Sequence, residues 1–360
     1  MRIKTLIHLQ TTLPLLLLAA CGGGSMAPDT SSEDVVPAQA TPPPYKAYVT
    51  NEGSGDLTVI AGGTYDVLAT IPLGKRPRGI KVDPAGERLF VALSGSPPAP
   101  PGVDEDTLPP PDRSADGIGI VDLAEERVVT VLNAGTDPEQ VAVSADGTRV
   151  FVANEDAALA SIVDIDTATV LAELPVGGEP EGVTRSPNGR WVYITSENDS
   201  QVSVIDTESL EIAAVFDVGA RPRSSTFSPD STRAYVTAEN GGNVSVVDTN
   251  DHTVIETIQL TGENVRPMDA KVSPDGSRLY VSTGRGRTVV VLDTTSYEIV
   301  SSIEVGTRPW GLDLTADGRY LYAANGPSND VSVIDTDTLT VVATVAAGER
   351  PWGVAIVEGP

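Results

Sequence analysis

Cysteine and histidine are almost missing from this sequence. One cysteine, Cys21, and two histidines, His8 and His252, occur in 360 residues. A disulfide, a Cys-ligated zinc ion, an iron–sulfur cluster or a c-type haem attachment each need more cysteines. A Ser-His-Asp triad, a His-rich zinc site and a His-ligated haem are disfavoured by the lack of histidine. We therefore expect no metal, no cofactor and no catalytic centre.

Basic residues are also scarce. Lys and Arg number 24 against 50 Asp and Glu, so the formal net charge is −26. Phosphate backbones require a strongly basic surface, and this composition excludes nucleic acid as a partner. The same negative charge keeps an exported protein soluble and repels other negatively charged surfaces.

No apolar run is long enough to span a bilayer. The N-terminus carries Arg2 and Lys4, and the apolar stretch 13–18 follows, as in an export signal. Small residues then precede the only cysteine, in Leu18-Ala19-Ala20-Cys21.

This arrangement resembles the lipobox of bacterial lipoproteins. We expect residues 1–20 to be a lipoprotein signal peptide and Cys21 to be lipidated. Removing residues 1–20 changes the net charge from −26 to −28, because it takes away two cations and no acids. The alternative is an ordinary export signal with a coincidental cysteine. In the lipoprotein interpretation the chain is held on a bacterial membrane by its lipid anchor alone, facing the periplasm or the cell surface.

Residues 21–44 are predicted to be a flexible tether after the lipidated cysteine. They are rich in Gly, Ser, Ala and Pro and end in three prolines. Such a composition cannot bury a core.

From residue 45 the chain repeats. A glycine-rich turn, a proline and an apolar strand recur with separations of 61, 42, 42, 45, 42 and 42 residues, the marker prolines being Pro77, Pro138, Pro180, Pro222, Pro267, Pro309 and Pro351. Each unit holds four short strand-like runs separated by turn residues. Four strands per period of about 42 residues predict an all-β fold, a seven-bladed β-propeller with four-stranded blades over residues 45–360.

The last marker proline begins a strand that ends the chain. Three further strand-like runs lie at the other end, at 47–50, 57–60 and 67–70. We expect the C-terminal innermost strand to pair with these three N-terminal strands and close the ring, which removes exposed sheet edges. The long first interval is explained by an insert, residues 94–115, in blade one.

The repeat resembles a known family. Tyr48-Val49-Thr50-Asn51, Val204-Ile205-Asp206-Thr207 and Arg350-Pro351-Trp352-Gly353 are similar to the YVTN-family β-propeller repeat of YncE-like and surface-layer proteins. More distantly the chain resembles lactonase-like propellers and the large subunit of quinoprotein amine dehydrogenases. The resemblance implies the fold strongly and a function weakly.

The turns that lead into the innermost strands should form a ring around one channel mouth. The basic and aromatic residues beside the marker prolines are candidates for ligand binding: Arg76, Arg78, Arg221, Arg223, Arg266, Arg308, Trp310, Arg350 and Trp352. An acidic arc comes from blades two and three: Asp137, Glu139, Glu179 and Glu181. Arginine and indole suit an anionic or amphipathic ligand.

Two alternatives to ligand binding remain open for this ring. The arginines can instead pair with loop acids such as Glu52, Glu197 and Glu239, since structural ion-pair networks also cluster charges. Glu139 and Glu181 occupy equivalent positions in adjacent blades and are a conceivable acid–base pair. The aspartates that close the third strands are expected to cap turns rather than bind metal.

The sequence favours a binding or scaffolding module that presents its channel-mouth face to an envelope protein or a small anionic ligand. The alternative is an enzyme component, either a lactonase-like hydrolase or the propeller subunit of a periplasmic quinoprotein-type dehydrogenase. A third interpretation, a purely structural surface protein, leaves the polarised ring unexplained.

Overall fold

The computed structural model describes residues 44–98 and 107–359 of the chain. The predicted signal peptide, Cys21 and most of the tether lie outside the described residues. No helix in the described ranges is long and apolar enough to cross a membrane.

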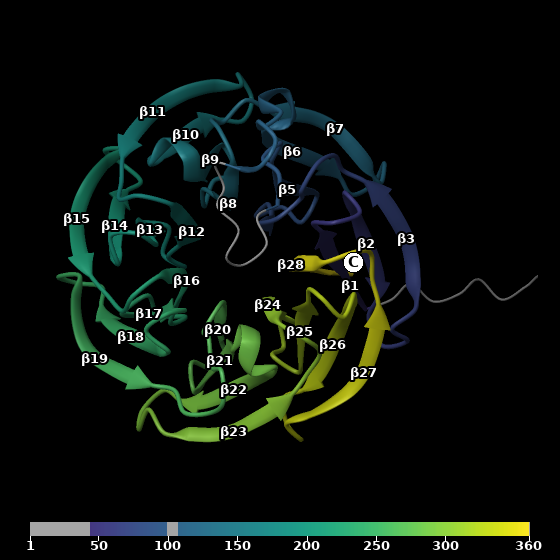
Figure 1. The fold of residues 1–360 in the computed structure, drawn as a ribbon, viewed down its shortest axis with the longest axis vertical. Coiled ribbons are helices and arrows are strands. Elements are labelled where there is room, and N and C mark those ends of the chain that lie inside the picture. The colour runs from purple at the N-terminus through teal and green to yellow at the C-terminus, as the bar shows by residue number, and fades with distance from the viewer. Residues whose placement is uncertain (1–43, 99–106, 360) are drawn as a thin grey trace, which may run out of the picture. The chain divides into compact units, whose positions relative to one another are not determined.

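In these described residues, twenty-eight strands form seven four-stranded antiparallel sheets arranged in a ring (Figure 1). This confirms the predicted seven-bladed propeller. The strands are given from the innermost outward. Blade one consists of β4 (Ile80–Val82), β5 (Arg88–Leu93), β6 (Gly117–Asp122) and β7 (Arg127–Leu132), and blade two of β8 (Pro138–Val143), β9 (Arg149–Asn154), β10 (Leu159–Asp164) and β11 (Thr169–Pro175). Blade three consists of β12 (Pro180–Arg185), β13 (Trp191–Ser196), β14 (Gln201–Asp206) and β15 (Glu211–Asp217), and blade four of β16 (Pro222–Phe227), β17 (Arg233–Ala238), β18 (Asn243–Asp248) and β19 (Thr253–Gln259).

The last three blades complete the ring. They are β20 (Ala270–Val272), β21 (Arg278–Ser282), β22 (Thr288–Asp293), β23 (Ile299–Glu304); β24 (Pro309–Leu314), β25 (Tyr320–Asn325), β26 (Asp330–Asp335), β27 (Thr340–Ala346); and β28 (Pro351–Glu358), β1 (Tyr45–Asn51), β2 (Asp56–Ala61), β3 (Val67–Pro72). In blade seven, β28 pairs with β1 in the register Ala47↔Ile356 and Tyr48↔Ala355. The predicted closure of the ring by the C-terminal strand is confirmed.

Each pair of neighbouring blades shares a cluster of buried apolar side chains. Seven such clusters fill the seven interfaces between blades. Between blades six and seven, for example, Tyr322 and Val333 pack with Val49 and Ile356. Strands with β-branched and aromatic residues on both faces suit this arrangement, because each middle strand is covered by a blade on either side.

Aspartates at the ends of the third strands cap the following turns, as predicted. Asp293, for example, accepts hydrogen bonds from the main-chain N–H groups of Thr295 and Ser296, at 2.9 and 2.8 Å. The same pattern occurs after β14 and β26. These turns fix the hairpin between the third and the outermost strand.

Candidate functional site

The turns before the innermost strands hold strained backbone. Six of the seven residues that precede a marker proline have a left-handed conformation, with φ between 40° and 58°: Arg76, Asp137, Glu179, Arg221, Arg308 and Arg350. This conformation is uncommon for residues other than glycine, and a following proline disfavours helical backbone. Such strain often gathers at functional sites.

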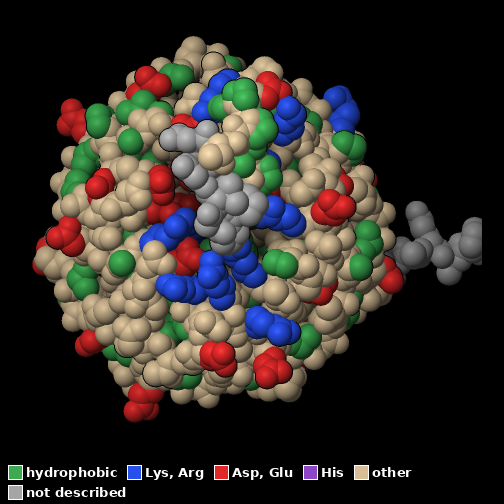
Figure 2. Space-filling model, viewed as in Figure 1, with side chains coloured by type: hydrophobic (Ala, Val, Ile, Leu, Met, Phe, Trp, Pro, Cys, Tyr) green, Lys and Arg blue, Asp and Glu red, His purple; other side chains and the backbone are tan. Residues whose placement is uncertain are grey.

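A cavity of about 370 Å³ opens at the centre of this face. Lys and Arg side chains gather around the centre of the face, whereas Asp and Glu side chains are mostly scattered over its outer part (Figure 2). Residues Ser96, Pro97, Leu108, Pro109, Pro111 and Arg113 of the insert line one side of the cavity. The insert thus contributes to the rim of the cavity.

Most of the predicted mouth residues line this cavity. Ten of the thirteen do so: Arg76, Arg78, Asp137, Glu139, Glu181, Arg221, Arg223, Arg308, Trp310 and Trp352. Arg266 instead donates a hydrogen bond to Asn240 Oδ1 at 2.8 Å, and Arg350 pairs with Glu52 at 3.2 Å. Glu179 is half-buried in its turn. These three are not part of the cavity wall.

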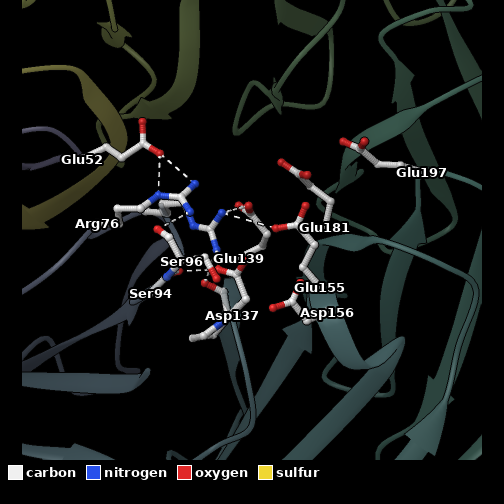
Figure 3. Close-up of polar contacts among 12 residues, drawn as sticks. Glu52, Arg76, Ser94, Ser96, Asp137, Glu139, Glu155, Asp156, Glu181 and Glu197 are labelled. Carbon is white, nitrogen blue, oxygen red and sulfur yellow. Dashed lines mark hydrogen bonds and ion pairs between the residues drawn. The ribbon is translucent and has the colours of Figure 1, made fainter. Parts of the chain in front are cut away.

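Arg78 organises the acidic wall. Its side chain is 1% exposed and forms ion pairs with Asp137, at 2.5 Å, with Glu139, and with Glu155 at 3.4 Å. Asp137 also accepts a hydrogen bond from Ser94 Oγ. Figure 3 shows these three carboxylates of blade two gathered around the Arg78 guanidinium. A buried guanidinium with several carboxylates is stable only because each charge has a partner.

Arg223 has the same role in blade four. It is 8% exposed and forms ion pairs with Glu181, at 2.5 Å, and with Glu197. Arg221 then joins Glu197 and Glu239, at 2.7 and 3.2 Å, and Glu52 accepts from Arg76 at 3.1 Å. Loop acids therefore hold several mouth arginines in place, as the ion-pair alternative anticipated.

Glu139 and Glu181 are each engaged by a different arginine, Arg78 and Arg223 respectively. A further carboxyl, Glu155, shares Arg78 with Glu139 and interacts electrostatically with Glu181. It belongs to the short 3-10 helix Glu155–Ala157 that follows β9.

Burial raises the pKa of Glu155 to about 7; Arg78 opposes this effect, whereas Glu181 and Asp137 add to it. Burial likewise raises the pKa of Glu181, against the effect of Arg223 and Arg78. At neutral pH Glu155 is therefore divided between its protonated and ionised forms. That is the condition for a group that accepts and returns a proton.

Sequence reasoning did not single out Glu155. An acid directly follows the second strand of four blades, as Glu52, Glu155, Glu197 and Glu239. Aligning the repeats at this position would have placed Glu155 on the same face as the marker turns.

The opposite wall is cationic and aromatic. The Arg308 guanidinium lies 4.9 Å from the Trp310 ring centroid and forms no ion pair with any described residue. Trp310 meets Trp352 edge to face, with ring centroids 5.3 Å apart. Both indole Nε1–H groups are buried without a hydrogen-bond partner in the described structure. Unsatisfied donors beside an uncompensated cation suit a ligand that brings acceptor oxygens.

Burial lowers the pKa of Arg308; Glu239 opposes the effect, whereas Arg223, Arg285 and Arg350 add to it. Three other guanidinium groups thus contribute to the field at Arg308, and Glu239 is the acid that opposes them. An anion is the natural counterpart.

The described residues contain no group of three or more His, Cys, Asp or Glu side chains arranged to hold a metal ion. His252 does not line the mouth cavity. It packs against Trp191 and shares a hydrogen bond of 2.8 Å between its Nδ1 and Tyr193 Oη.

Comparisons with known proteins agree on the propeller. The model of the family described as "Lactonase, 7-bladed beta-propeller" matches residues 206–351, and that of the "Cytochrome D1 heme domain" matches residues 111–228. None of the curated proteins matches this chain in sequence. The fold is therefore confirmed, while kinship with the YVTN-type family stays a prediction.

Several solved structures are similar to this chain in fold. A putative 6-phosphogluconolactonase from Bacteroides fragilis is similar with a TM-score of 0.70 and 18% identity, over 87% of this chain and 98% of that one. The Kuenenia stuttgartiensis hydrazine synthase is similar with a TM-score of 0.68 and 20% identity, over 80% and 91%. The dihydro-heme d1 dehydrogenase NirN is similar with a TM-score of 0.63 and 17% identity, over 88% and 77%. At these identities the likeness concerns the fold.

Proposed function

We propose that the mouth cavity is an acid–base site for a small anionic substrate, and that the chain is a hydrolase of the lactonase kind. The observation that carries this proposal is that one cavity has two chemically different walls. Glu155, with a pKa of about 7, lies on one wall, and the uncompensated Arg308 with Trp310 lies on the other. A proton-transfer group and an anion-binding group thus line one cavity.

The chemistry of lactone hydrolysis suits these groups. Ionised Glu155 takes a proton from a water molecule as the water oxygen attacks the ester carbonyl carbon. The carbonyl oxygen gains negative charge, which a guanidinium on the wall stabilises. The ring C–O bond then breaks, and the proton held by Glu155 passes to the departing oxygen, which leaves a hydroxy acid. Arg308 binds the carboxylate or phosphate of the substrate.

The comparisons support an enzyme component better than the scaffolding module favoured by the sequence. Both matching family models and the three similar structures carry the names of enzymes or of a cofactor domain. The scaffolding interpretation gains no comparable support.

The similarity to a haem d1 domain raises the question of a tetrapyrrole. Among the described residues that line the cavity there is no His, Met, Cys or Tyr, the side chains that commonly ligate haem iron. The described residues of the cavity therefore do not fit a haem iron, which such side chains commonly ligate. We derive no step through such a group.

We also propose that the enzyme works outside the cytoplasm, anchored through Cys21. The motif Leu18-Ala19-Ala20-Cys21 supports this aspect of the proposal. An anchored hydrolase would act on small acids or esters in the periplasm or at the cell surface.

The proposal is tested by following hydrolysis of a sugar-acid δ-lactone and its 6-phosphate by pH-stat, with spontaneous hydrolysis subtracted. We expect turnover of the phosphorylated lactone, with kcat lost by at least about 100-fold in Glu155→Gln. Glu173→Gln, at an exposed glutamate of the outermost strand β11 that does not line the cavity, is the matched control and keeps its activity. Absence of turnover of either lactone by the unaltered protein refutes the lactonase proposal.

Binding of the anion is tested separately. Arg308→Met should raise KM for the phosphorylated lactone by about tenfold or more, while Arg308→Lys, which keeps the charge, should restore most of the affinity. Equal KM values for both variants and the unaltered protein would remove Arg308 from the site.

A further inference from the structure

Lysine is rare in this chain, and half of the described lysines lie in the channel. Nineteen of the twenty-four basic residues are arginine, and only Lys46, Lys75, Lys81 and Lys271 occur in the described ranges. Lys46 and Lys75 lie at the surface and pair with Glu126 and Asp112, at 3.3 and 2.6 Å. Arginine keeps its proton in proteins, whereas lysine can lose it. Two lysines in the channel of an arginine-rich protein therefore suggest a use for a neutral amine.

The two channel lysines come from opposite sides of the ring. Lys81 is on β4 of blade one and Lys271 is on β20 of blade five. Their ammonium groups are close enough that each is the other's electrostatic neighbour. Asp269 and Asp313 are the acids that face them.

The environment distinguishes the two amines. Lys271 forms an ion pair with Asp313 at 3.6 Å, whereas Lys81 has no carboxylate within 4 Å among the described residues. Asp269 and Asp313 also accept main-chain hydrogen bonds from Leu312 and Ile356, both at 2.9 Å, which fixes them in place. Of two adjacent ammonium groups, the one without a partner loses its proton first.

The pKa values follow this geometry. The ammonium of Lys271, and then burial, lower the pKa of Lys81 to about 8, against the effect of Asp269 and Asp313. Burial opposes the charge of Lys271, but Asp313 and Asp269 outweigh it and raise the pKa of that residue. A cationic neighbour that stays protonated is one recognised means of activating a lysine as a nucleophile.

Lys81 is accessible from the face opposite the mouth cavity. It lines a second cavity, of about 340 Å³, with Asp83, Thr184 and Arg185. Asp83 forms an ion pair with Arg88, at 3.0 Å, and is therefore neutralised. Arg185 donates from Nε to the Val143 carbonyl at 2.8 Å and from Nη1 to the Ser186 carbonyl at 3.1 Å. The second N–H of Nη1 and both N–H groups of Nη2 are left to donate to a ligand. The cavity thus combines an amine with a guanidinium.

We propose that Lys81 is a carbonyl-reactive amine in a second site, which takes a small oxo acid through the cavity opposite the mouth. The neutral Nζ adds to the carbonyl carbon, its two N–H protons pass to the carbonyl oxygen, which leaves as water, and a C=N bond (an imine) forms. No oxidant or reductant takes part. Arg185 binds the carboxylate of the oxo acid. This inference does not depend on the function proposed for the mouth cavity.

The test is trapping of the imine on the full-length chain. The protein is incubated with pyruvate at pH 8, borohydride is added to reduce the imine to a stable secondary amine, and modified lysines are located by peptide mass spectrometry. Lys46 and Lys75 are internal references of ordinary environment. We expect Lys81 to be modified at least about tenfold faster than either, because about half of it is deprotonated at this pH.

Two further measurements decide the mechanism. Lys271→Met removes the cationic neighbour, so the pH midpoint for labelling of Lys81 should move upward by a unit or more, while Lys81 itself is still present. Acetaldehyde, which lacks the carboxylate, should label Lys81 more slowly than pyruvate relative to the surface lysines. Labelling of Lys81 no faster than Lys46 and Lys75, an unmoved midpoint in Lys271→Met, or equal preference for acetaldehyde would each overturn the proposal.

Discussion

Glu155 should make the folded protein less stable as the pH rises through neutrality. Its pKa of about 7 in the folded state is above the ordinary value of 4.5. The folded state therefore holds the proton more tightly, and the stability that this provides is complete below pH 4.5. It is lost progressively up to about pH 7 and absent above it. A difference of this size corresponds to about 3 kcal/mol, as an upper limit.

Glu155→Gln removes the loss of stability that ionisation of Glu155 causes at high pH. Glutamine is similar in shape to protonated glutamate, and its amide oxygen can still accept the hydrogen bond that Arg78 Nη1 donates at 3.4 Å. We expect the variant to be more stable than the unaltered protein by up to about 3 kcal/mol at pH 8, and equally stable at pH 4.5. The same variant should lack hydrolase activity, which is the stability–activity trade-off expected of a catalytic carboxyl.

The assay is urea unfolding at pH 4.5, 6 and 8, with comparison of midpoints and slopes. Asp156→Asn is the matched control, because Asp156 is exposed and pairs with Arg113 at the surface. Such a pair contributes less than about 1 kcal/mol, so its loss should have little effect between pH 6 and 8. A Glu155→Gln stability change that is independent of pH, or a loss of stability at pH 8, would refute the reasoning.

Three further outcomes are expected. Arg78→Met leaves buried carboxylates unpaired and should lower the free energy of unfolding by about 3–5 kcal/mol, whereas Arg221→Met, at a half-exposed pair, should cost less than about 1 kcal/mol in the same urea titration. Deletion of residues 351–360 removes β28 and should abolish the cooperative thermal transition seen by circular dichroism; a retained transition would show that the ring does not need this strand. Cys21→Ala should move the protein from the membrane fraction to the soluble fraction, and unchanged membrane retention would contradict lipidation.

The fold was predictable because the repeat is regular. Prolines spaced by 42 residues, four β-rich runs per period and aspartates at fixed turn positions each carry local information about strands and turns. The closure by β28 was predictable from the number of strands. The last repeat holds only one strand, and the three strands before the first marker proline lack a fourth, so together they make one complete blade.

The site was predictable in position but not in chemistry. The marker turns located the mouth, and ten of its predicted residues line the cavity. Which charges compensate one another depends on contacts between blades, and these are invisible in a linear repeat. Arg78, for instance, is neutralised by acids that lie 59 to 77 residues away along the chain.

Glu155 and Lys81 were missed for the same reason. The repeated acid after the second strand gives the position of Glu155 but not its proton affinity, and Lys81 belongs to no recognisable motif. The character of each comes from burial and from neighbouring like charges. A search for catalytic histidine or cysteine in the sequence could not reveal a carboxyl or an amine whose proton affinity is set only in the folded ring.

The pairing of β28 with β1 also sets the order in which the molecule can form. These strands are separated by about 300 residues, so their contact has one of the largest loop-closure costs in the chain. Until the final strand emerges, the apolar flanks of blades one and six have no complete neighbour. The ring consequently cannot close before β28 has been synthesised, and this open stage is the one most exposed to aggregation.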